Sequence, residues 1–71
     1  MTKRVAVELI ICTNDKRWNT HYEFIEEDNF NIAEEISISQ FVDKLQSGEI
    51  DSYKESEITF IGVLESKEVK I

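Results

Sequence analysis

The chain of 71 residues carries 15 acidic and 8 basic side chains, a net charge of −7, and 41% of its residues are hydrophobic. This length allows one domain, residues 1–71, and the hydrophobic content excludes an intrinsically disordered chain. The negative charge disfavours direct binding to nucleic acids and to membranes, which are themselves anionic. Because Cys12 is the single cysteine and no apolar stretch is long enough for a leader or a membrane span, we expect a cytoplasmic protein.

The acidic excess lies in the middle of the chain. Residues 23–57 hold eleven acidic and two basic side chains, whereas residues 1–22 hold two acidic and four basic, and residues 58–71 hold two of each. A negative field of this kind attracts basic protein surfaces. We therefore predict an acidic binding surface made of carboxylates from this segment: Glu26, Glu27, Asp28, Glu34, Glu35, Asp43, Glu49 and Asp51.

A β-hairpin is predicted at the start of the chain. Residues 5–13 are apolar on both alternating faces, as is typical of a central strand, and residues 18–26 form a second strand with large aromatic side chains on one face. Residues 14–17, NDKR, have the composition of a turn. Placing Thr13 opposite Trp18 gathers the large apolar side chains of both strands on one face, which favours that register.

The same register predicts a small polar cluster. It sets Glu8 directly opposite Glu23, with His21 on the same face, and two carboxylates in that position repel unless a proton, a cation or a base lies between them. One interpretation is a metal-binding or acid–base cluster. The alternative is that all three side chains simply point into water.

One amphipathic helix is predicted over residues 38–47. Ser37 and Gln40 fit a capping box at its start, and Gly48 supplies its C-terminal stop. Apolar residues follow at helical spacing, so the helix covers one face of a sheet. These residues are Ile38, Phe41, Val42 and Leu45.

Residues 58–64 are again apolar on both faces and predict a third strand, which residues 65–71 either extend or follow with a short fourth one. The fold class is therefore α+β, a small β-β-α-β(β) domain with a three- to four-stranded, mainly antiparallel sheet. A crossover sets the third strand beside the first. One helix covers only one face, so we expect homodimerisation through the other, lined by Ala6, Ile10, Ile25, Ile61 and Val63.

Motifs for most enzyme classes are missing. The chain has two glycines, one histidine and one cysteine, which argues against phosphate-binding glycine loops, zinc sites and nucleophile–histidine triads. We expect a small non-enzymatic regulatory protein, without a cofactor, whose segment 23–57 binds a basic protein surface. The alternatives are a nucleic-acid-mimicking inhibitor of a DNA- or RNA-handling enzyme, a structural subunit of an assembly, and a small enzyme or metal subunit that uses Glu8, Glu23 and His21.

Overall fold

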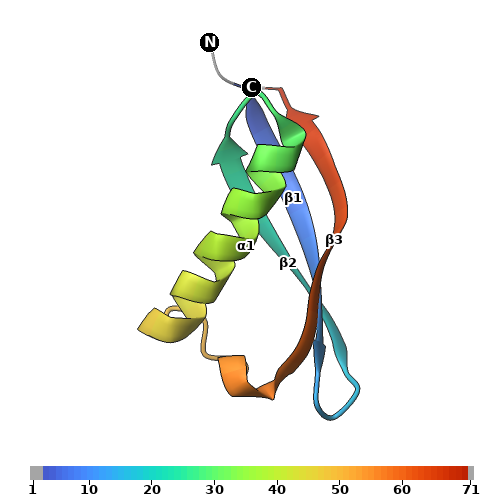
Figure 1. Ribbon diagram of the computed structural model, residues 1–71, viewed down its shortest axis with the longest axis vertical. Helices are drawn as coiled ribbons and strands as arrows, with labels where there is room; N and C mark the ends of the chain where they lie inside the picture. The colour runs from blue at the N-terminus through green and yellow to red at the C-terminus, as the bar shows by residue number, and fades with distance from the viewer. Residues whose placement is uncertain (1–2, 71) are drawn as a thin grey trace.

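The computed structural model describes residues 3–70 and shows a small α+β fold (Figure 1). Strand β1 (Arg4–Thr13) is followed by strand β2 (Trp18–Glu26) and helix α1 (Phe30–Ser47). A short 3-10 helix, η1 (Glu55–Glu57), leads into strand β3 (Ile58–Val69). Strand β1 lies in the centre and pairs antiparallel with both neighbours, in the order β2-β1-β3. The predicted central position of the first strand, with the last strand beside it, is confirmed.

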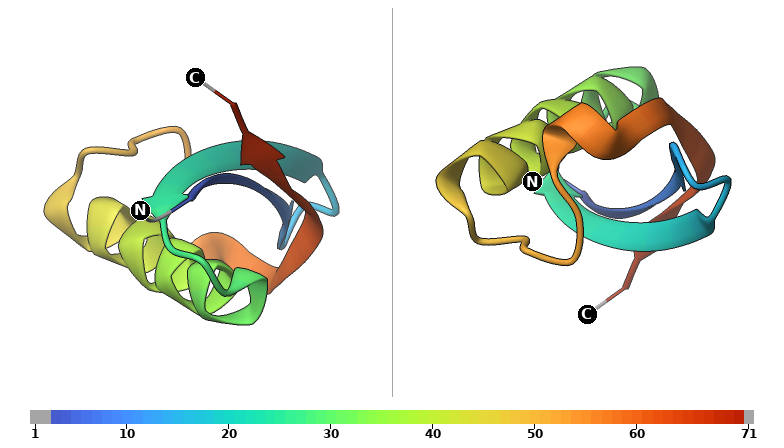
Figure 2. Two further views of the ribbon diagram at one scale, coloured as in Figure 1. Left: turned by 90° about the horizontal axis from the view of Figure 1, so that it is seen from above. Right: turned by 90° about the horizontal axis from the view of Figure 1, so that it is seen from below.

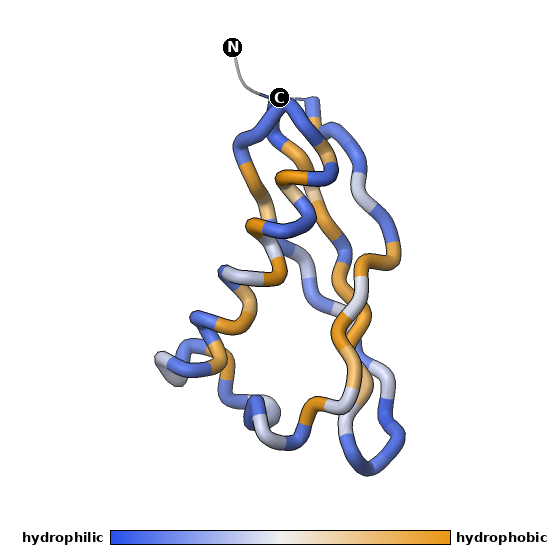
Figure 3. The backbone as a smooth tube through the Cα atoms, in the orientation of Figure 1, coloured by the Kyte–Doolittle hydropathy of each residue, from blue (hydrophilic) through white to orange (hydrophobic). Residues whose placement is uncertain are grey.

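The sheet is curved, and α1 lies on its concave side (Figure 2). The core between them contains every second residue of β1 from Val5 to Ile11, and these four side chains are fully shielded from solvent. Hydrophobic residues recur along the strands and the helix, whereas the tip of the hairpin is hydrophilic (Figure 3). The buried apolar residues of this core are Val5, Val7, Leu9, Ile11, Ile25, Ala33, Phe41 and Leu45.

Helix α1 begins at Phe30, much earlier than the predicted start at residue 38. Its N-cap is Asn29, whose side-chain oxygen accepts hydrogen bonds from the backbone N–H groups of Asn31 and Ile32. The predicted capping box is therefore wrong, because Ser37 lies inside the helix, fully buried, and its hydroxyl donates to a backbone carbonyl of the preceding turn. Its small side chain, like that of Ala33 one turn earlier, allows the helix to lie close to the sheet.

The predicted C-terminal end of the helix is confirmed. Gly48 adopts the left-handed conformation, with φ of 83°, and its N–H donates to the carbonyl of Leu45. Within residues 3–70 the tail continues β3 to Val69 and makes no fourth strand. Strand β3 carries a register shift where Leu64 has no partner on β1. None of the helices within these residues is both long and apolar enough to cross a membrane.

The predicted register of the hairpin is wrong by one residue. Cys12, and not Thr13, lies opposite Trp18. The N–H of Thr13 donates to the carbonyl of Arg17, and the N–H of Lys16 donates to the carbonyl of Thr13, so the loop has three residues where four were expected. Lys16 takes a positive φ of 65°, the left-handed position that closes such loops. A slip of one residue exchanges the two faces of β2.

Candidate functional site

The exchange of faces redistributes the residues of the predicted dimer surface. Ala6 and Ile10 lie on the face of the sheet that no helix covers, as expected. Ile25 is buried in the core opposite Val5. Ile61 and Val63 pair with core residues of β1 and pack against the same core. The five residues therefore do not form one surface, because three of them lie under α1.

Aromatic side chains occupy the uncovered face instead. Trp18, Tyr22 and Phe24 share the same face of β2, and their exposed fractions are 61%, 52% and 62%. Phe60 on β3 is 51% exposed, and its ring meets that of Trp18 edge-on, with the two centroids 6.1 Å apart. The bulge residue Leu64 is exposed as well. Monomeric proteins rarely leave so many large apolar side chains in water unless that surface binds something.

Two carboxylates lie in the middle of this aromatic face. Glu8 on the central strand pairs with Glu65 across to β3 and with Tyr22 across to β2. Glu8 is half-buried, whereas Glu65 is exposed. Hydrogen bonding to Glu8, reinforced by the negative charge of that carboxylate, raises the pKa of the Tyr22 phenol above its ordinary value of 10.0. The predicted partner of Glu8 was Glu23, which lies on the opposite face.

The Tyr22 hydroxyl provides a spectroscopic test of this arrangement. In a Tyr53→Phe background, in which Tyr22 is the only tyrosine, the midpoint of the phenolate absorbance titration should lie above pH 10.0. Adding Glu8→Gln should shift that titration to lower pH, because the charge that opposes ionisation is gone. Since the folded pKa is raised, the stabilising contribution is complete below pH 10.0 and is lost as the pH rises through the folded pKa. An unchanged titration in the Glu8→Gln variant would contradict the contact.

The covered face holds a buried charged network. Glu23 is only 2% exposed, and its Oε2 atom accepts from Nε2 of His21 at 2.5 Å and from Nζ of Lys44 at 2.8 Å. Lys44 is the only basic residue of α1, so this contact joins the helix to β2. The His21 ring also packs on Phe41, with centroids 5.0 Å apart. These contacts hold the helix on the sheet and leave the carboxylate inaccessible to a substrate.

The predicted metal or acid–base cluster is therefore not assembled as expected. His21 and Glu23 are in contact, but Glu8 lies on the other side of the sheet. Within residues 3–70, no group of three potential metal-ligating side chains comes together.

The predicted acidic surface is spread over three parts of the molecule. Glu26, Glu27 and Asp28 follow one another at the end of β2, where Glu26 pairs with Arg4 and the other two accept backbone hydrogen bonds. A second group lies on α1 and a third in the connection that follows it. The exposed members of these two groups are Glu35, Asp43, Glu49 and Asp51, and Glu34, which is half-buried, accepts from the hydroxyl of Ser66 at 2.6 Å.

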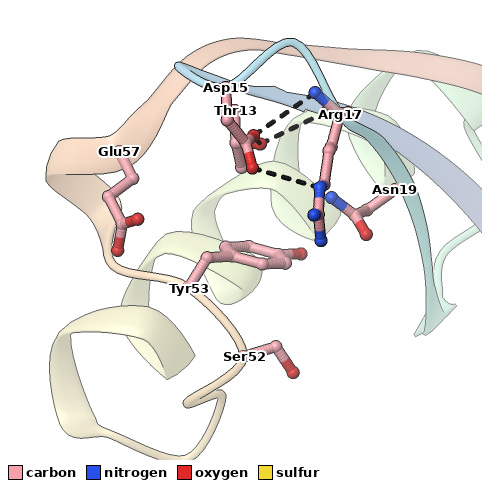
Figure 4. A pocket seen from close by; sticks show the side chains of 7 residues that line it. All are labelled: Thr13, Asp15, Arg17, Asn19, Ser52, Tyr53 and Glu57. Atoms are coloured by element: carbon pink, nitrogen blue, oxygen red, sulfur yellow. Dashed lines mark hydrogen bonds and ion pairs between the residues drawn. The ribbon is translucent and has the colours of Figure 1, made fainter.

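A polar cavity of about 150 Å³ opens between the hairpin tip and the connection after α1 (Figure 4). Two of its charged groups are paired with each other, because Asp15 contacts Arg17 through an ion pair of 3.2 Å, and Asp15 also accepts from the hydroxyl of Thr13. That hydroxyl, followed by the backbone N–H and charge of Arg17, lowers the pKa of Asp15 below 3.8 despite some desolvation. The lining residues are Thr13, Asp15, Arg17, Asn19, Ser52, Tyr53 and Glu57. The Glu57 carboxylate accepts from the backbone N–H of Lys54, so the charged side chains of the lining take part in contacts that hold the hairpin turn and the start of η1.

Sequence reasoning missed the burial of Glu23 and the exposure of the aromatic residues on β2. One signal for the first was present: Lys44 is the only cation in the helix, at the edge of its apolar stripe. A lone cation at that position is expected to meet an acid on the covered face, because an unpaired charge there is costly.

Comparisons of the chain with protein-family models, with characterised proteins and with solved structures find no match.

Proposed function

We propose that this chain is a small non-enzymatic interaction protein that binds a protein partner with a basic surface. The observation that carries the proposal is the uncovered sheet face, on which Trp18, Tyr22, Phe24 and Phe60 are each more than half exposed. Aromatic side chains of this kind are the residues that contribute most binding energy in protein interfaces. The net charge of −7 selects for partners of opposite charge.

In this proposal the acidic residues and the aromatic face have different tasks. The carboxylates of segment 23–57 are distributed over the end of β2, the helix and the connection after it, so they act together as a long-range negative field. Such a field speeds the encounter with a basic partner and weakens as salt rises. The aromatic face makes the close contact. An enzyme that handles nucleic acids presents a basic surface of this type. The proposal therefore includes the alternative in which this chain is a nucleic-acid-mimicking inhibitor of such an enzyme.

The test compares two double variants in capture experiments from lysate of the source organism. Trp18→Ser/Phe24→Ser removes two exposed rings of the sheet face, and Ile32→Ser/Gln40→Ser changes two exposed positions on the outer side of α1 as a matched control. We expect the wild type and the control to retain the same basic protein in stoichiometric amount. The sheet-face variant should lose it, with a dissociation rate raised by about tenfold or more.

A second variant tests the role of the charges. Glu26→Lys/Glu27→Lys/Asp28→Lys should slow association and flatten its salt dependence while leaving dissociation nearly unchanged. Capture that is indifferent to the sheet-face substitutions, or retention of no protein by the wild type, would contradict the proposed function.

A further inference from the structure

The centre of the uncovered face carries an uncompensated pair of like charges. Glu8 and Glu65 occupy directly opposite positions on β1 and β3. Like charges in this position destabilise a sheet. Within residues 3–70, neither carboxylate takes part in an ion pair, although at the end of the same face Arg4 pairs with Glu26 at 3.3 Å. Lys67 stands opposite Ala6 on the same face, but within residues 3–70 it forms no ion pair with Glu8 or Glu65, so the two carboxylates in the middle of the aromatic surface have no charged partner.

From this arrangement we infer that the uncovered face docks an arginine side chain of the partner protein between Glu8 and Glu65. The inference rests on the function proposed above and names the chemistry of its contact. A guanidinium group is planar, donates in two directions at once and forms paired hydrogen bonds with carboxylates. It also stacks on aromatic rings, and the ring of Tyr22 stands directly beside Glu8 on the other flank.

Arginine fits this surface better than lysine does. The ammonium group of lysine is compact and strongly hydrated. It therefore loses more hydration free energy than a guanidinium group when it enters a surface lined by rings such as those of Trp18, Phe24 and Phe60. The guanidinium is weakly hydrated, and its two faces remain available for aromatic contact. Half-burial of Glu8 strengthens the attraction, because the carboxylate is already partly withdrawn from water.

A second copy of the chain is a poor occupant of the same face. In a symmetric dimer each copy presents the same patch to the other. Such a dimer would bring two Glu8 and two Glu65 carboxylates together near the symmetry axis, between two molecules that each carry a charge of −7. The homodimer expected from the sequence is therefore opposed by charge on the very surface that is free to form it.

Three capped peptides test the inference directly. The first, acetyl-Gly-Phe-Arg-Phe-Gly-amide, presents one arginine between aromatic side chains. The second carries lysine at that position, and the third carries citrulline, which has the shape of arginine but no charge. Binding to the full chain is followed by two-dimensional NMR. The arginine peptide should shift the amides of β1 and β2 around Glu8 and Tyr22 and bind about tenfold or more tightly than the citrulline peptide.

The variant Glu8→Gln/Glu65→Gln provides the decisive comparison. Because it removes a repulsive pair, it should fold at least as stably as the wild type in urea denaturation. It should also bind the arginine and citrulline peptides equally. Equal binding of the two peptides by the wild type would overturn the inference, as would shifts confined to Glu35 and Asp43 on α1. Sedimentation showing a wild-type dimer that Trp18→Ser disrupts would overturn it in favour of self-association.

Capture of the natural partner distinguishes a failure of the inference from a failure of the proposed function. If capture of the natural partner depends on Trp18 and Phe24 but survives Glu8→Gln/Glu65→Gln, the aromatic face binds without an arginine and only the inference is wrong. If capture survives both sets of substitutions, the proposed function is wrong as well.

Discussion

Replacing Lys44 by methionine is expected to lower the free energy of unfolding by about 2–3 kcal/mol. The substitution leaves the carboxylate of Glu23, which is 2% exposed, with His21 as its remaining partner. An uncompensated buried charge of this kind commonly costs roughly 3–5 kcal/mol, and we expect a somewhat smaller loss because His21, which reaches water, remains in contact with the carboxylate. Urea denaturation followed by far-UV circular dichroism measures the loss.

Variants that remove Glu23, alone or together with Lys44, should lose less stability than Lys44→Met. Glu23→Leu should cost less than Lys44→Met, since the ammonium group that it leaves behind is partly exposed and regains water. The double variant Glu23→Leu/Lys44→Met should recover most of the stability, because it removes both charges from the interface. Lys70→Met, at an exposed position near the end of the chain, is the control. A Lys44→Met variant as stable as that control would show that the network does not hold the helix.

Truncating Phe41 to alanine is expected to unfold the domain. The side chain is fully buried, and its ring packs between those of His21 on the sheet and Tyr53 in the connection after α1, at centroid distances of 5.0 Å and 6.4 Å. Loss of a buried phenylalanine costs about 3–5 kcal/mol. A core of this size rarely provides more than about 3–5 kcal/mol of net stability, so little would remain.

A graded series keeps this prediction measurable. Phe41→Leu should retain the fold and lose about 1–2 kcal/mol, since it leaves a smaller cavity. Ile32→Ala on the same helix removes a side chain that is 44% exposed and should change stability by only about 0.5 kcal/mol. The readouts are urea denaturation and the dispersion of amide signals in NMR. A well-dispersed spectrum for Phe41→Ala, with stability equal to that of Ile32→Ala, would contradict the proposed role of the ring.

Local sequence signals predicted the C-terminal end of helix α1 correctly but not its start. Gly48 marks its C-terminal end correctly, because a left-handed residue at that position is a local requirement that glycine meets without strain. The start was misplaced because Ser37 and Gln40 resemble a capping box, while the true cap, Asn29, stands earlier in the chain. Ser37 instead serves as a small buried residue against the sheet. Whether Ser37 caps the helix or is buried inside it depends on how closely the helix packs on the sheet, and no local sequence pattern indicates that packing distance.

The sequence by itself determined the class of the fold, the extents of β1 and β2 and the central position of β1, because strands that are apolar on both alternating faces are usually central. The same pattern in residues 58–64 predicts a second central strand, and this prediction is wrong because β3 lies at the edge of the sheet. Only the tertiary structure decided which side chains face the helix. That choice turned on Lys16, which adopts a positive φ of 65° in a three-residue loop although nothing in a lysine side chain signals it. Because side chains alternate with a period of two, this single residue of register buries Glu23 beneath α1 and turns the aromatic rings of β2 toward solvent.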